Sequence, residues 1–116
     1  DASWGSSEPH PQMVSLLQRL PTGERIGVFA GSDAMAAGAY AAAAAASLRI
    51  PEDVLVVGFD DILAARWLTP PLSTVHQPIR EMAAAAVRML ADAAAGEVLP
   101  AEPVVLPTRL IVRGST

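Results

Sequence analysis

Two short, continuous runs of apolar residues constrain the fold of this chain more than any other feature. They are residues 26–30 (IGVFA) and 54–58 (VLVVG), and each is followed by polar residues and then by a segment that favours a helix. A run that is apolar throughout, rather than alternating, is typical of a strand buried on both faces, the usual form in a parallel sheet. We therefore predict two central strands of an α/β domain.

Helical segments alternate with these runs. Before the first run, apolar residues recur at helical spacing, and Ser6 or Ser7 is the predicted N-cap. Residues 34–48 form a second predicted helix, which is rich in alanine, a strong helix former. Pro78 suits the first position of a third helix, which Gly96 is placed to end.

The remaining segments are predicted to be extended. Residues 67–77 carry two prolines, and residues 104–106 and 110–112 are two short predicted strands separated by Pro107. The order helix, strand, helix, strand, helix, strand predicts a parallel sheet flanked by helices. Right-handed crossovers place the carboxyl ends of the central strands at one edge, where open α/β sheets bind their ligands.

Polar residues follow both central strands at that edge. Asp60 comes directly after the second strand, and its carboxylate can accept hydrogen bonds from two neighbouring hydroxyls, as a sugar ring presents them. Alternatively, Asp60 or Asp61 caps the short helix that follows. After the first strand, Asp33 is predicted to cap the next helix, which leaves Ser32 as the residue of the two that faces a ligand.

Both tryptophans have two interpretations. Trp4, before the first helix, belongs either to a core or interface or to a site where it stacks on a sugar or base. Trp67 and Leu68 lie in a proline-rich segment expected at the surface. They are therefore buried either against a partner or beneath the chain's own loop.

Charge and residue types exclude several functions. The net charge is −4, and the eight basic residues are scattered arginines, so this stretch lacks the basic patch that grips nucleic acid. There is no cysteine, and neither His10 nor His76 has a second ligand at metal spacing. No Ser-His-Asp arrangement is present, and residues 31–33 hold too few glycines for a phosphate loop. We therefore expect no metal, no cofactor and no catalysis.

The alanine-rich stretch 34–46 contains Gly38 and Tyr40 and falls short of the roughly 20 apolar residues that span a membrane. No basic segment followed by an apolar run opens the chain, so no signal peptide is expected. These features, together with the lack of cysteine, predict no membrane association and a cytoplasmic location.

Four blocks of the sequence resemble the lactose-repressor/galactose-repressor (LacI/GalR) family of transcription regulators. They are residues 33–38 (DAMAAG), 48–61 (LRIPEDVLVVGFDD), 70–78 (PPLSTVHQP) and 110–116 (LIVRGST). The resemblance implies an α/β fold with a parallel sheet flanked by helices. This would be one lobe of a type I periplasmic-binding-protein-like core, truncated, with the DNA-binding head and most of the N-terminal lobe outside the chain.

The resemblance also implies a division of the chain. Residues 1–77 would form the C-terminal lobe of the effector-binding core, and residues 108–116 a strand that returns to it. Residues 78–107 would be a crossover helix and strand that belong with the missing N-terminal lobe. In the chain by itself, the apolar side of the Pro78 helix should then pack on another copy, pack on the lobe, or stay exposed.

Ligand residues carry over by position. Asp60 matches the acid that holds effector hydroxyls, and Trp4 matches the aromatic residue that packs on the ligand ring. Ser32 stands where the family often has Asn or Asp, and its shorter side chain weakens the case for a direct contact. Gln77 matches a polar residue at the crossover that can face the cleft.

The implied partners are a small-molecule effector, expected to be a sugar, and a second copy of the chain. The homodimer interface would include Met35, Arg66, Trp67 and Leu68. The effector would bind one orientation of the lobes more tightly and so favour it, which would control operator binding. Operator DNA would be contacted only by the N-terminal head. Pentoses, hexoses, disaccharides and nucleosides all fit a carboxylate beside an aromatic ring.

Three other functions remain open on the sequence. The main alternative is a periplasmic sugar-binding receptor of a transporter, which has the same fold and a similar pocket. The second is an enzyme lobe that uses Asp60 as an acid or base, and the third is a module that only dimerises. Residues 51–53 and 70–72 favour the regulator over the receptor.

Overall fold

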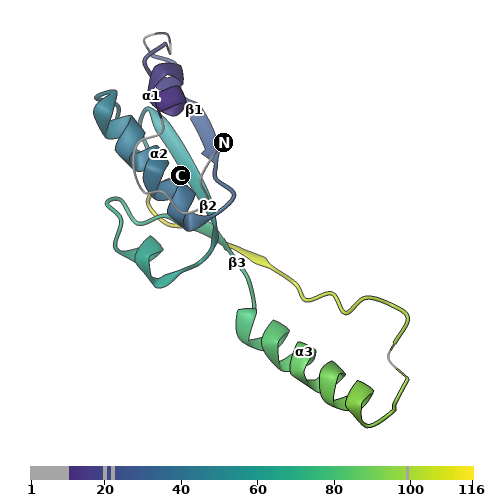
Figure 1. Cartoon of the computed structure of the whole chain (residues 1–116). Coiled ribbons are helices and arrows are strands. Elements are labelled where there is room, and N and C mark those ends of the chain that lie inside the picture. Colours follow the sequence, from purple (N-terminus) through teal and green to yellow (C-terminus); the bar gives the residue numbers. More distant parts are fainter. Residues whose placement is uncertain (1–10, 20, 22, 99) are drawn as a thin grey trace. The chain divides into compact units, whose positions relative to one another are not determined.

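The computed structural model describes residues 11–19, 21, 23–98 and 100–116. Its elements, in chain order, are α1 (Pro11–Leu17), β1 (Ile26–Phe29), α2 (Asp33–Ala45), β2 (Val54–Asp60), the 3-10 helix η1 (Leu63–Arg66), β3 (Ser73–His76), α3 (Ile79–Ala94) and β4 (Arg109–Ile111). Helices and strands alternate along the chain, which confirms the predicted α/β class (Figure 1).

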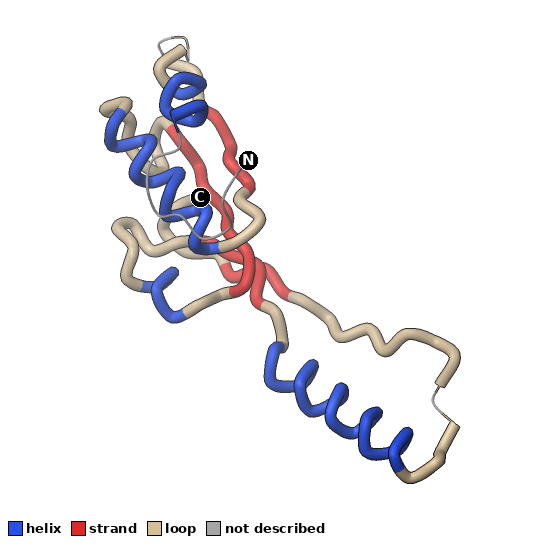
Figure 2. Tube along the Cα trace, viewed as in Figure 1, coloured by secondary structure: helices blue, strands red, loops and turns tan. Residues whose placement is uncertain are grey.

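The four strands form one sheet in the order β1-β2-β3-β4 (Figure 2). β1 pairs with β2 in parallel, and β2 pairs with β3 in parallel. Phe29, at the end of β1, lies opposite Val57, which in turn lies opposite Ser73. β2 and β3 therefore continue beyond β1, as far as the pair Asp60 and His76. This step at the carboxyl edge puts the end of β2 beside β3 alone.

One face of the sheet carries the core. Along β2 the residues Val54, Val56 and Gly58 are buried, on the side where α2 packs, and α1 packs against α2 in turn. Small side chains let the helix lie close to the strand, although each buries little area. The buried apolar residues are Leu17, Ala30, Ala36, Ala39, Ala42, Ala43, Val54, Val56, Ala65 and Leu72.

Several segments differ from the sequence prediction. β2 extends to Asp60 rather than ending at Gly58, because it pairs with β3 as far as His76. β3 lies within residues 67–77, which are predicted to be extended but not to form a strand. α2 ends at Ala45, since Ser47 adopts the left-handed conformation (φ 57°) that commonly ends a helix. The strand predicted at 104–106 is wrong: that stretch belongs to no sheet, and Val105 is 81% exposed.

The chain divides into two compact units. The first runs through His76 and also takes in Leu110–Thr116, whereas the second is Gln77–Arg109. The assignment of residues 1–77 and 108–116 to a C-terminal lobe, and of 78–107 to an N-terminal one, stays a prediction.

The second unit is built on α3, and none of the residues of this helix is buried. Ile79, Met82, Val87 and Leu90 are all exposed, at 55%, 44%, 65% and 70%. Which of the three outcomes expected for this apolar side applies to the protein stays a prediction. Within the described ranges, no helix is long and apolar enough to cross a membrane.

Candidate functional site

The loop after β2 has an unusual backbone. Asp60 and Asp61 both have positive φ, at 109° and 57°. Residues with a side chain rarely adopt this region, and each such residue costs about 1–3 kcal/mol unless its surroundings enforce it. Strain of this kind clusters at ligand-binding sites, and it persists only where other contacts hold the backbone in place.

One anchor of the loop is the Asp61 carboxylate, whose side chain is 6% exposed. Its Oδ1 accepts a hydrogen bond from Arg113 Nη2 at 2.5 Å, and its Oδ2 lies 3.0 Å from His76 Nδ1. Burial raises the pKa of Asp61, but the hydrogen bonds from Arg113 and His76 outweigh it, and the pKa lies below its ordinary value. Asp61 is therefore held as a charged group between β3 and the chain's last residues.

A second anchor is Asp33, which is 2% exposed. Its Oδ1 accepts a hydrogen bond from Thr74 Oγ1 at 2.5 Å, and its Oδ2 accepts one from the Ile62 amide at 2.8 Å. Space for this carboxylate comes from Gly58, since a Cβ there would lie 3.3 Å from Asp33 Cγ and closer still to Oδ1. Asp33 thus joins the start of α2 to β3 and to the loop.

The helix caps differ from the prediction. Ser32, not Asp33, caps α2, because Ser32 is the extended residue before the helix and its hydroxyl accepts the Met35 amide at 3.1 Å. The hypothesis that Asp60 or Asp61 caps the short helix is also wrong. The N-cap of η1 is Ile62, and that end has no side-chain cap.

Residues 113–116, the last of the chain, form hydrogen bonds with the strands of the sheet. Ser115 Oγ donates to the Val56 carbonyl at 2.6 Å and accepts the Ser73 amide at 2.8 Å. The Arg113 amide donates to Ser73 Oγ, and Arg113 Nη1 donates to the Leu72 carbonyl, both at 2.8 Å. The sequence reasoning did not assign these residues, although the 110–116 block was part of the family resemblance.

Asp60 lies at the edge of the sheet, as predicted. It is the last residue of β2, it is partly exposed, and its Cα partner in β3 is His76. A carboxylate in that place can accept hydrogen bonds from hydroxyl groups. Among the described residues, no group of three or more His, Cys, Asp or Glu could hold a metal ion.

The other predicted ligand residues are less well defined. Gln77 follows β3 directly, is partly buried and belongs to the second unit, where its carbonyl accepts the Ile79 amide at 2.9 Å. Ser32 is occupied as a cap, and Trp4 lies outside the described residues. A ligand contact for these three residues, and for Asp60, stays a prediction.

The predicted interface residues fall into two groups. Met35 and Leu68 are partly buried and pack against the core. Arg66 and Trp67 are exposed, Trp67 at 73%. Trp67 is therefore not packed beneath its own loop, the alternative that the sequence left open, and a dimer interface at these residues stays a prediction.

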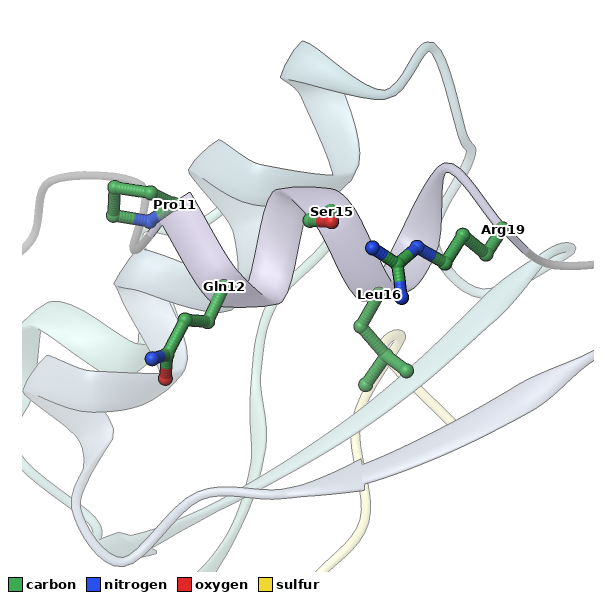
Figure 3. A pocket seen from close by; sticks show the side chains of 5 residues that line it. All are labelled: Pro11, Gln12, Ser15, Leu16 and Arg19. Atoms are coloured by element: carbon green, nitrogen blue, oxygen red, sulfur yellow. The ribbon is translucent and has the colours of Figure 1, made fainter.

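A separate hollow lies against α1 (Figure 3). Its lining residues are Pro11, Gln12, Ser15, Leu16 and Arg19. None of them is a predicted ligand residue, so we assign no site there.

Comparisons with known proteins agree with this fold. The chain matches the model of a family described as the periplasmic binding protein-like domain, over residues 2–116. It is similar to the ribose operon repressor of Escherichia coli (strain K12), with 42% identity over 88 residues, 76% of this chain and 27% of the repressor. That relative is a transcription regulator rather than an enzyme.

Two solved structures are also similar. One is a complex of the transcriptional regulator CelR with cellobiose, with a TM-score of 0.79, 40% identity, and coverage of 90% of this chain and 31% of that one. The other is the lac repressor dimer bound to operator and the anti-inducer ONPF, with a TM-score of 0.78, 30% identity, and coverage of 90% and 36%. The chain thus spans roughly a third of the length of these regulators.

Proposed function

The chain belongs to the periplasmic binding protein-like domain family, and from that premise we propose that it is the effector-binding and dimerisation region of a sugar-responsive, DNA-binding transcription regulator. The observation that carries the proposal is the strained loop at the carboxyl edge of β2. There Asp60 presents a carboxylate from a backbone anchored through Asp61 and Ile62. Rigid support of this kind suits recognition of a small polar ligand.

The effector in this proposal is a sugar. Asp60 accepts hydrogen bonds from two neighbouring ring hydroxyls, one at each oxygen of its carboxylate. Trp4 packs on the apolar face of the ring, and Gln77 and Ser32 add polar contacts. The similarity to a regulator solved with cellobiose and to a ribose operon repressor supports a sugar over other small polar ligands.

Signalling in this proposal is a shift between two lobe orientations of a dimer. The effector binds one orientation more tightly and so changes how the dimer holds operator DNA. In this proposal DNA contact belongs to a head outside this sequence, and the chain's own charge of −4 supports that division. The exposed Trp67, with Arg66, Leu68 and Met35, forms part of the dimer surface, and the similarity to a repressor solved as a dimer on operator supports this.

The test is a thermal-shift screen of the intact protein that carries this chain, with D-ribose, cellobiose, lactose and sucrose. A ligand at 100 times its Kd stabilises the native state by about 2.7 kcal/mol, enough to raise Tm by several degrees. We expect a shift with at least one sugar that is lost in Asp60→Ala. The matched control is Glu52→Ala, an exposed acid just before the opposite end of β2, which should keep the shift.

Two outcomes contradict the proposal. If no sugar shifts Tm, the sugar class is wrong. If the shift survives in Asp60→Ala, Asp60 is not the residue that holds the hydroxyls.

A further inference from the structure

We propose that the hydrogen-bonded pair Asp33 and Thr74, here called the Asp33–Thr74 bridge, is the positioning device that aims Asp60 at the effector. The inference rests on the proposed function, because it assigns Asp33 and Thr74 a role in that site. Neither residue needs to touch the sugar. Both act through the backbone of residues 60–62.

The bridge binds the amides of the two residues that follow Asp60. Asp33 Oδ2 accepts the Ile62 amide at 2.8 Å, and Thr74 Oγ1 accepts the Asp61 amide at 3.4 Å. Thr74 Oγ1 also donates to Asp33 Oδ1 at 2.5 Å, which links the two acceptors. The backbone that leaves Asp60 is therefore fixed to the start of α2 and to the middle of β3.

Helix capping does not explain a carboxylate at position 33. Ser32 already caps α2 through the Met35 amide. A buried carboxylate is costly unless its oxygens are satisfied, and Asp33 is 2% exposed, with Thr74 fully buried. Two of its described partners, Thr74 and Ile62, lie on β3 and in the loop, so the contacts that offset its burial are those that shape the loop.

The sheet is built to admit this carboxylate. Gly58 lies opposite Thr74 in the register of β2 and β3. A Cβ at Gly58 would overlap Asp33 Oδ1 and would lie 2.9 Å from Leu72 Cδ2. The absence of a side chain at this one strand position therefore reserves the space that the bridge occupies.

The loop is held from its other side as well. The Asp61 carboxylate is fixed by Arg113 and His76, while its amide faces Thr74. The left-handed backbone at Asp60 and Asp61 persists because these contacts enforce it. An effector then meets a carboxylate whose supporting backbone is already ordered, and binding does not have to order it.

The test compares Thr74→Val, which removes the hydroxyl at constant shape, with Thr74→Ser, which keeps it. Amide hydrogen exchange of Asp61 and Ile62 is measured by NMR in the intact protein, with the Ile26 amide, bonded to the Asp53 carbonyl at 3.1 Å, as an internal reference. Thr74→Val removes the acceptor of the Asp61 amide and also the donor that fixes Asp33, the acceptor of the Ile62 amide. Exchange of the two loop amides should therefore speed up by about tenfold. Thr74→Ser should restore their protection, and Ile26 should be unchanged in both.

Affinity for D-ribose and cellobiose, measured by calorimetry, is the second readout. For whichever sugar binds, Thr74→Val and Asp33→Asn should weaken Kd by about tenfold, while Thr74→Ser stays near the parent value. Unchanged protection of Asp61 and Ile62 in Thr74→Val overturns the inference. So does faster exchange with unchanged affinity, because the loop would then not aim Asp60.

The two proposals fail in different ways. If no sugar of the thermal-shift panel binds the parent protein, the sugar function is contradicted, whereas the exchange experiment still decides whether the bridge holds the loop. If all amides, including Ile26, exchange faster in Thr74→Val, the hydroxyl stabilises the whole unit, and a specific positioning role is refuted.

Discussion

Gly58→Ala adds one methyl group at the point where β2, β3 and α2 meet. The new Cβ would lie 2.9 Å from Leu72 Cδ2 and 3.3 Å from Asp33 Cγ, and it would overlap Asp33 Oδ1. Leu72 is fully buried and Asp33 is 2% exposed, so neither side chain has free space into which it can move. We expect the Asp33 carboxylate to be displaced from its hydrogen bonds.

Two costs follow from that displacement. Overpacking in a closed core costs about 1–3 kcal/mol. A buried group that loses its hydrogen-bond partner costs about 1–3 kcal/mol of stability. The Thr74 hydroxyl and the Ile62 amide, which both donate to Asp33, would lose theirs. Alanine also lowers the conformational entropy of the unfolded chain, and this offsets about 0.4–1 kcal/mol of the destabilisation. The expected net loss in the free energy of unfolding is about 1–6 kcal/mol.

The assay is urea denaturation followed by circular dichroism, with Gly27→Ala as the matched control. Gly27 is also a strand glycine, but a Cβ there would meet nothing within 4 Å. Its stability should therefore stay within about 1 kcal/mol of the parent. Equal stability of Gly58→Ala and Gly27→Ala would refute the packing argument and, with it, the idea that Gly58 reserves space for Asp33.

Three further predictions concern the loop and the last residues of the chain. Arg113→Met should lower the free energy of unfolding by about 3 kcal/mol in urea, because it removes the arginine partner of the buried Asp61 carboxylate and leaves it with His76; a loss below about 1 kcal/mol would contradict this. The pKa of Asp61 is lowered by folding, so its contribution to stability is complete at neutral pH and is lost as pH falls below its ordinary value of 3.8. Asp61→Asn should flatten the acid limb of a plot of Tm against pH, and an unchanged limb would show that other groups cause it. Ser115→Ala should cost about 1–3 kcal/mol, since it leaves the Ser73 amide unpaired, and a neutral result in thermal denaturation would refute that contact.

The sequence supports prediction of the fold better than of its edges. Continuous apolar runs are a local signal, and they locate β1 and β2. The burial that they predict is found in β2 alone, because β1 is an edge strand of the sheet and its Phe29 is 68% exposed. β3 has no such signal, because it starts with Ser73 and Thr74, which are both fully buried. The Ser73 amide donates to Ser115 and the Thr74 hydroxyl to Asp33, 42 and 41 positions away in the sequence. Residues 104–106 show the reverse case, an apolar pattern that finds no strand to pair with.

The location of the candidate site could be predicted from the sequence, but the hydrogen bonds that hold its loop could not. The position of Asp60 at the edge of the sheet follows from the end of an apolar run and the rule for parallel sheets. That Ser32 rather than Asp33 caps α2 could not be deduced, because a cap depends on which residue is the last extended one. The partners of Asp33 and Asp61 lie on β3 and at residues 113–116, and spacing along a chain carries no information about such distant contacts.

The chain's last residues also set the order in which the first unit can be completed. Ser115 reaches back 59 positions to Val56, and Arg113 reaches back 52 positions to Asp61. A ribosome delivers the whole second unit before these residues appear, so until then β3 is an outer strand with an open edge. Contacts that close so long a loop form slowly, and open edges are where nascent chains aggregate. Synthesis of β4 therefore ends the period in which β3 is an open edge, and Arg113 and Ser115, which follow it, then fasten the finished sheet.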